Sequence, residues 1–132
     1  MNPKAILHVD DDEGWRNIVV ETLHGAGYQI TSAESQAHAM ELLRENQYHL
    51  LILDLSLVIN DASDIQGMQI LSQLFQFSLF RTPEIILLTG YCTKERIREA
   101  FRLGVADVMD KFDFDKIDFV NSVKLILAEN GS

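Results

Sequence analysis

Residues 6–12 read ILHVDDD, a short apolar run that ends abruptly in three consecutive acids. The same design returns at residues 49–54, HLLILD, where a second apolar run ends in a single acid. Apolar runs of about four to eight residues between polar boundaries are typical of strands that are buried on both faces of a sheet. The two stretches therefore predict two buried strands whose ends carry carboxylates.

The rest of the chain alternates similar apolar runs with amphipathic segments. Strands are predicted at 5–9, 28–33, 49–53, 84–88 and 105–109. Helical spacing of apolar residues begins at Trp15 and ends near Gly25 and Gly27, and it recurs at 37–43, 67–80, 93–103 and 115–129. Gly104 is a natural end for the helix at 93–103. This alternation predicts an α/β fold, with helices on both faces of a parallel five-stranded sheet.

Composition narrows the class of protein. The chain has 132 residues, 47% of them hydrophobic, which is enough for one domain spanning 1–132. A net charge of −9 makes direct nucleic-acid binding a poor expectation. No apolar run reaches the roughly eighteen residues of a membrane helix, and residues 1–4 lack a signal-peptide design. Because the single cysteine, Cys92, cannot form an internal disulfide, we expect a cytoplasmic protein.

Chemistry is expected where the strands end. In an open doubly wound sheet, ligands bind beyond the carboxyl ends of the strands, at the point where the strand order reverses. If the order is 2-1-3-4-5, the first and third strands are neighbours at that point and their acids converge on one site. The residues that follow the strands are Asp10, Asp11, Asp54, Thr89, Gly90 and Lys111.

Three carboxylates at one site repel each other. Two unit charges about 4 Å apart cost roughly 4 kcal/mol at an effective dielectric constant near 20. Either one carboxyl group stays protonated or a cation neutralises the cluster, and oxygen ligands with open water positions suit Mg²⁺. Lys111 would add a positive charge and Thr89 a hydroxyl donor. Together these groups are similar to a phosphoryl-transfer site whose nucleophile is a carboxylate.

Four segments carry a family resemblance. They are 6–12 (ILHVDDD), 51–55 (LILDL), 85–90 (IILLTG) and 104–111 (GVADVMDK). In this order and at this spacing, they resemble the receiver domains of two-component response regulators over nearly the whole chain. The resemblance implies a flavodoxin-like (βα)5 fold with a doubly wound parallel sheet of strand order 2-1-3-4-5.

The resemblance also implies a metal site. Asp54 would be the phosphoacceptor and would share a Mg²⁺ or Mn²⁺ ion with the acids at the end of the first strand. Asp11 would bind the ion directly, and Asp10 would bind it directly or through water. Ser56, two residues beyond the acceptor, would contribute its backbone carbonyl.

The phosphoryl group would have its own partners in such a domain. Thr89 would hydrogen-bond the group and move when it arrives, Gly90 would lie beside it, and Lys111 would bind one of its oxygens. The family takes the group from a sensor histidine kinase or a histidine phosphotransfer protein, and passes the signal to an effector or output domain. It is not a conventional enzyme class, although members phosphorylate themselves from small donors and hydrolyse their own aspartyl phosphate.

Several positions depart from the family pattern. The loop after Asp54 looks longer than usual and has Val58 where a proline is common. Phe112 replaces a proline that often follows a cis bond, and because a cis bond without proline costs about 2.5–4 kcal/mol we expect a trans bond. Val108 stands where an aromatic residue often reports phosphorylation by rotating. Gly90 replaces a common alanine, which we expect to open space near the phosphate.

Other interpretations remain at this stage. The acids at 10–12 could serve the N-terminus of a helix, and Asp12 is expected to be a cap. The chain could be a receiver-like interaction module that works without phosphate, or could form a homodimer through the face around residues 105–109. A haloacid-dehalogenase phosphatase needs a second aspartate where Ser56 stands, and flavin binding lacks a phosphate-cradling loop after residue 9.

Overall fold

The computed structural model describes residues 4–54, 83–90 and 93–131. Five parallel strands form one sheet in the order β2-β1-β3-β4-β5. Their bounds are β1 (Ala5–Val9), β2 (Gln29–Ala33), β3 (Leu50–Leu53), β4 (Glu84–Thr89) and β5 (Asp107–Asp110). The predicted doubly wound order 2-1-3-4-5 is therefore confirmed, whereas the helix predicted at 67–80 lies outside the described residues.

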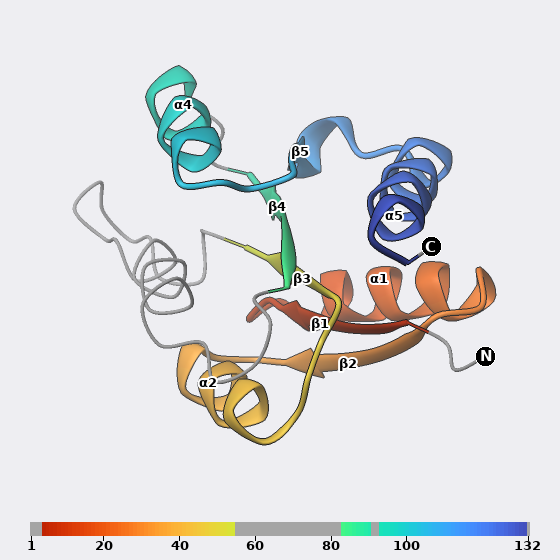
Figure 1. Cartoon of the computed structure of the whole chain (residues 1–132). Coiled ribbons are helices and arrows are strands. Elements are labelled where there is room, and N and C mark those ends of the chain that lie inside the picture. Colours follow the sequence, from red (N-terminus) through yellow and green to blue (C-terminus); the bar gives the residue numbers. More distant parts are fainter. Residues whose placement is uncertain (1–3, 55–82, 91–92, 132) are drawn as a thin grey trace.

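Helices cover both faces of this sheet (Figure 1). On one face lie α1 (Glu13–Gly25) and α5 (Lys116–Gly131), and on the other lie α2 (Gln36–Glu45) and α4 (Lys94–Arg102). A short 3-10 helix, η2 (Lys111–Asp113), joins β5 to α5. The arrangement is the one that alternating strands and helices predict.

Local side chains fix where the helices begin and end. Asp12 caps α1 by accepting a hydrogen bond from the backbone N–H of Trp15, as predicted for this acid, and Thr93 caps α4 in the same way. Gly27 after α1 and Gly104 after α4 have φ angles of 95° and 98°, a conformation that side-chain-bearing residues rarely adopt.

The start of β5 differs from the prediction. The apolar pattern indicated a strand from Val105, but β5 begins at Asp107. The backbone N–H of Val105 donates to the carbonyl of Ala100 and so completes the end of α4. The next N–H, that of Ala106, donates to the carbonyl of Ile85, and regular pairing with β4 begins at Asp107, opposite Ile86.

The three central strands, β1, β3 and β4, are buried on both faces. All four residues of β3 are fully buried, and their side chains alternate between two clusters. Leu51 and Leu53 pack with residues on the α2 and α4 side, whereas Leu50 and Ile52 pack with Phe119 and others on the α1 and α5 side. Burying a large apolar side chain contributes about 1.5–3 kcal/mol, so this two-sided core fixes the positions of the strand ends.

Candidate functional site

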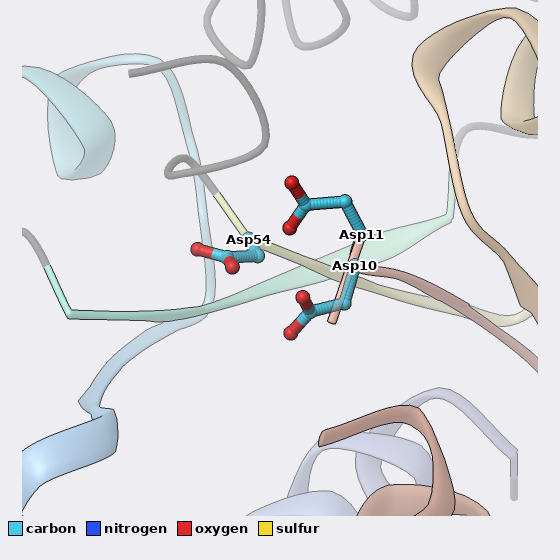
Figure 2. Close-up of side chains that lie close together, drawn as sticks. All are labelled: Asp10, Asp11 and Asp54. Atoms are coloured by element: carbon cyan, nitrogen blue, oxygen red, sulfur yellow. The ribbon is translucent and has the colours of Figure 1, made fainter. Parts of the chain in front are cut away.

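The register of the sheet brings three acids together. Val9 at the end of β1 pairs with Leu53 at the end of β3, so Asp10 and Asp54 follow neighbouring strands at the same level. The backbone N–H of Asp54 donates to the carbonyl of Val9 at 3.0 Å and extends this pairing. Carboxylate oxygens of Asp10, Asp11 and Asp54 all lie within 4.8 Å of one another. Figure 2 shows the three side chains extending toward one region beyond the two strands.

Asp10 is held firmly in a buried setting. It is 0% exposed, and its Oδ1 accepts a hydrogen bond from the backbone N–H of Asp12 at 2.9 Å. Its carbonyl accepts a second from Nη1 of Arg16 at 2.8 Å. Burial raises the pKa of Asp10 to about 6, against the opposing effect of its hydrogen bonds with Lys111 and Asp12. The carboxyl group is therefore mainly ionised at neutral pH and becomes protonated in mild acid.

Lys111 supplies the positive charge of the site. Its Nζ lies 2.6 Å from Oδ2 of Asp54 and 2.7 Å from Oδ2 of Asp10. Burial tends to lower the pKa of Lys111, but the bonds to the two carboxylates outweigh burial and the net shift is upward. The side chain therefore stays an ammonium group, and it bridges the two buried acids.

The backbone around Lys111 is ordered by an aspartate. Lys111 is the first residue of η2, and Asp110 before it is the N-cap. The Oδ1 of Asp110 accepts a hydrogen bond from the backbone N–H of Phe112 at 2.8 Å. Among the described residues no peptide bond is cis, which confirms the expected trans bond between Lys111 and Phe112. A capped turn therefore directs Lys111 toward the acids in a connection that lacks the proline common in the family.

Thr89 is the last residue of β4, one residue beyond the predicted end of the strand, and Gly90 follows it. Thr89 is buried and pairs with Asp110 across the sheet. A Cβ atom added at Gly90 would lie 3.2 Å from Cε2 of Phe112. The expectation that Gly90 opens space near the site is therefore wrong, because the edge of the Phe112 ring occupies that space. Phe112 as a whole residue is nevertheless 88% exposed.

Two residues with aromatic rings lie near the site but were not among the predicted site residues. Trp15, predicted only as the start of a helical apolar pattern, has its ring centroid 5.1 Å from Nζ of Lys111. His8 is fully buried, with its Nε2 3.8 Å from Oδ2 of Asp10. Burial, followed by the nearby Lys111 charge, lowers the pKa of His8 to about 3, so the ring is neutral. In the sequence, only the position of His8 two residues before Asp10 indicated that it lies near the site.

Of the remaining predicted positions, Val108 is described by the structure and Ser56 is not. Ser56 and the long loop after Asp54, which includes Val58, lie outside the described residues. Val108 lies in β5, pairs with Leu87 and packs against the core cluster on the α2 and α4 side. A side chain of this kind fills the core but offers no aromatic ring at that position.

Residues 6–124 match the family model for the response regulator receiver domain. This chain belongs to the receiver-domain family of response regulators. Such domains act as phosphorylation switches in two-component signalling. The match covers β1 through most of α5, and therefore every described residue of the acidic site.

Curated relatives of this receiver domain are longer regulators. The transcriptional regulatory protein ZraR of Klebsiella oxytoca is 28% identical over 121 residues, which are 91% of this chain and 26% of that protein. The transcriptional regulatory protein CrdR of Helicobacter pylori is 27% identical over 116 residues, which are 87% of this chain and 52% of that protein. The chain thus spans only part of each of these relatives.

Solved structures agree on the fold of the receiver domain. A CheY-like receiver domain protein from Methanospirillum hungatei JF-1 matches with a TM-score of 0.83 at 22% identity, covering 97% of this chain and 96% of that one. The non-phosphorylated HemR receiver domain from Leptospira biflexa matches with a TM-score of 0.79 at 24% identity, covering 95% and 94%. At these identities, the likeness concerns the fold.

The family assignment removes the other classes considered from sequence. A phosphatase of the haloacid-dehalogenase class and a flavin-binding protein are both set aside, and the phosphate-independent interaction module is not favoured. Within the described part of the chain, no helix is long and apolar enough to cross a membrane.

Proposed function

We propose that this receiver domain, spanning 1–132, accepts a phosphoryl group on Asp54. The observation that carries the proposal is the bridge made by Lys111, whose Nζ lies 2.6 Å from the Asp54 carboxylate and 2.7 Å from that of Asp10. A buried carboxylate next to a fixed ammonium group suits an incoming phosphoryl group, because the ammonium can pair with a phosphoryl oxygen as charge develops.

The donor set fits a divalent cation. Three carboxylates within 4.8 Å offer hard oxygen ligands, two of them from buried residues, which is the chemistry that Mg²⁺ and Mn²⁺ prefer. We propose that Asp10, Asp11 and Asp54 hold such an ion, with the backbone carbonyl of Ser56 as a further ligand. When bound, the ion would supply positive charge that offsets the carboxylates and the phosphoryl oxygens.

The chain's own residues would then carry the transfer. A carboxylate oxygen of Asp54 attacks the phosphorus atom of a phosphohistidine, so that an O–P bond forms while the P–N bond breaks and the imidazole leaves. Lys111 binds an oxygen of the transferred group, and the Thr89 hydroxyl donates a hydrogen bond to another. Gly90 lies next to Thr89, so its backbone borders the group.

The partners follow from this chemistry. We propose a sensor histidine kinase or a histidine phosphotransfer protein as donor, and an effector or output domain as receiver of the signal. The curated relatives are transcriptional regulators, which supports such an output, although the chain itself spans only part of their length. The net charge of −9 supports an output through protein contacts rather than direct binding of nucleic acid by this domain. We also propose a cytoplasmic location, where such kinases act.

We propose that phosphorylation changes the structure around the carboxyl ends of β4 and β5. Thr89 and Asp110 are paired at the carboxyl ends of these strands, so a movement of Thr89 toward the phosphoryl group would be transmitted to β5 and η2. Val108 cannot contribute an aromatic rotation. We propose that this face rearranges, and that it forms the homodimer interface if the domain dimerises. Identical amide-exchange patterns with and without the phosphoryl mimic beryllofluoride would contradict the rearrangement.

The proposal is tested by titrating the ¹⁵N-labelled protein with beryllofluoride, with and without Mg²⁺. We expect saturable, Mg²⁺-dependent shifts of the amide resonances around Asp54 and Thr89, and none in Asp54→Asn. Asp113→Asn is a matched control, since Asp113 is an exposed acid of η2 outside the cluster of three carboxylates. Absence of binding to the wild-type protein would contradict the proposal.

A further inference from the structure

The ammonium group of Lys111 has an aromatic neighbour in addition to the two carboxylates. Its Nζ lies over the ring of Trp15, 5.1 Å from the centroid. A cation within about 6 Å of an aromatic face is attracted by the negative face of the ring, and tryptophan gives the strongest attraction. The Lys111 side chain is 11% exposed, so this attraction acts with little competition from water.

Trp15 is itself firmly placed. It lies in the first turn of α1, where its backbone N–H is bound by the cap Asp12 at 3.1 Å. Its ring meets that of Phe114 edge to face, with centroids 5.2 Å apart and planes at 90°. Phe114 in turn contacts the fully buried Phe119 at 5.2 Å. The three rings therefore tie the start of α1 to the connection between β5 and α5 that carries Lys111.

The ammonium group of a lysine needs neighbouring groups to hold it in one position. Its charge lies at the end of a flexible four-carbon stem, so neighbouring groups must fix where the ammonium stands. The connection after Lys111 contains Phe112 and no proline, and its backbone is held by the Asp110 cap at one end. The contact between Phe114 and Trp15 holds the other end.

We propose that Trp15 is a positioning residue that holds the Lys111 ammonium over the Asp54 carboxylate. The inference rests on the proposed phosphoryl-accepting function and adds a residue to it. Because the indole face attracts the cation in addition to the two carboxylates, the ammonium is in place before a phosphoryl oxygen arrives. Removing the ring would leave the lysine freer to move and weaken phosphoryl binding without touching the acids.

The test uses the fact that Trp15 is the single tryptophan of the chain. Replacing tryptophan throughout the protein with mono-, di- and trifluorotryptophan therefore changes this ring alone. Each fluorine withdraws charge from the ring face while nearly keeping the shape of the side chain. We expect the affinity for beryllofluoride and Mg²⁺ to fall stepwise along the series. Trp15→Leu should weaken it by about two- to thirty-fold, and Trp15→Phe should recover part of the loss.

A spectroscopic signature independent of phosphate accompanies this series. Cε of Lys111 is bonded to the Nζ that lies over the indole, so we expect the resonance of its protons to be shifted upfield in the wild-type protein and to lose that shift in Trp15→Leu. Tyr28→Leu is the matched control, because Tyr28 packs on the same core cluster but precedes β2, at the opposite end of the sheet. It should change neither the affinity nor the Lys111 resonance.

The outcomes separate the two proposals. If the wild-type protein binds beryllofluoride and the fluorinated series and Trp15→Leu bind equally well, the positioning role is refuted and the proposed function stands. If the wild-type protein does not bind it at all, the proposed function fails, and the Lys111 resonance decides the positioning role alone. An Lys111 resonance without an upfield shift overturns that role in either case.

Discussion

Replacing Asp10 with asparagine removes one of the two buried carboxylates of the site while keeping the shape of the side chain. In the protein without a divalent cation, the ionised Asp10 lies within 4.8 Å of two other acids and has one ammonium group to share with Asp54. Asparagine can still accept the hydrogen bond from the backbone N–H of Asp12 through its amide oxygen, while its amide nitrogen replaces the Oδ2 that faced Lys111, so the ammonium pairs with Asp54 alone. The change should therefore stabilise the metal-free protein.

The size of the effect follows from the pKa of Asp10. Burial raises this pKa from 3.8 to about 6, and a gap of about two units corresponds to about 3 kcal/mol between the two ionisation states. Because the folded-state pKa is the higher one, the folded protein loses this stability as the pH rises from about 4 through 6. Above that range the loss is constant. We expect Asp10→Asn to add about 2–3 kcal/mol at pH 7, and about 0.5 kcal/mol at pH 4.

Urea denaturation of both proteins in EDTA, at several pH values, measures this difference directly. Asp12→Asn is the control, since Asp12 is an exposed neighbour and asparagine caps a helix about as well as aspartate. Saturating Mg²⁺ should reverse the order by stabilising the wild-type protein more than the variant. A difference near zero at pH 7, or one that does not change with pH, would refute the reasoning.

Two further predictions concern the ion and the backbone. The affinity for Mg²⁺ should fall as the pH drops through about 6, because a proton on Asp10 competes with the ion; calorimetric titration at pH 5 and 7.5 checks this, and equal affinities would count against it. Gly104→Ala should destabilise the protein by about 1–2 kcal/mol, because its φ of 98° is strained for alanine. Gly90→Ala should change stability by less than about 0.5 kcal/mol, because the exposed Phe112 ring can shift, and urea denaturation should separate the two variants.

The fold was predictable from the sequence because the three central strands, β1, β3 and β4, are buried on both faces. Runs such as the one ending at Leu53 are apolar at every position, and the helices between them carry their own caps and terminal glycines. The start of β5 was not predictable in the same way, because Val105 is apolar like a strand residue but its N–H bonds to the end of α4, and regular pairing with β4 begins only at Asp107. The apolar pattern does not show where the backbone bonds of one element give way to those of the next.

The acidic site could also be predicted from the sequence, because it depends on the arrangement of the strands. Strand order and parallel register bring the ends of β1 and β3 together, so the convergence of Asp10 and Asp54 follows from topology. The contact between Trp15 and Lys111 depends instead on the path of the connection between β5 and α5. Likewise, the filling of the space beside Gly90 depends on where the Phe112 ring turns. Such contacts are set by loop geometry, which has no period in the sequence.

The most direct test of the central claim is transfer of a phosphoryl group to Asp54. The protein and its Asp54→Asn variant would be incubated with acetyl phosphate, with and without Mg²⁺, and their intact masses recorded. We expect a single phosphoryl adduct that requires Mg²⁺ and is absent from the variant. No adduct on the wild-type protein, together with no binding of beryllofluoride, would contradict it. An adduct of equal yield on the variant would contradict the assignment of Asp54.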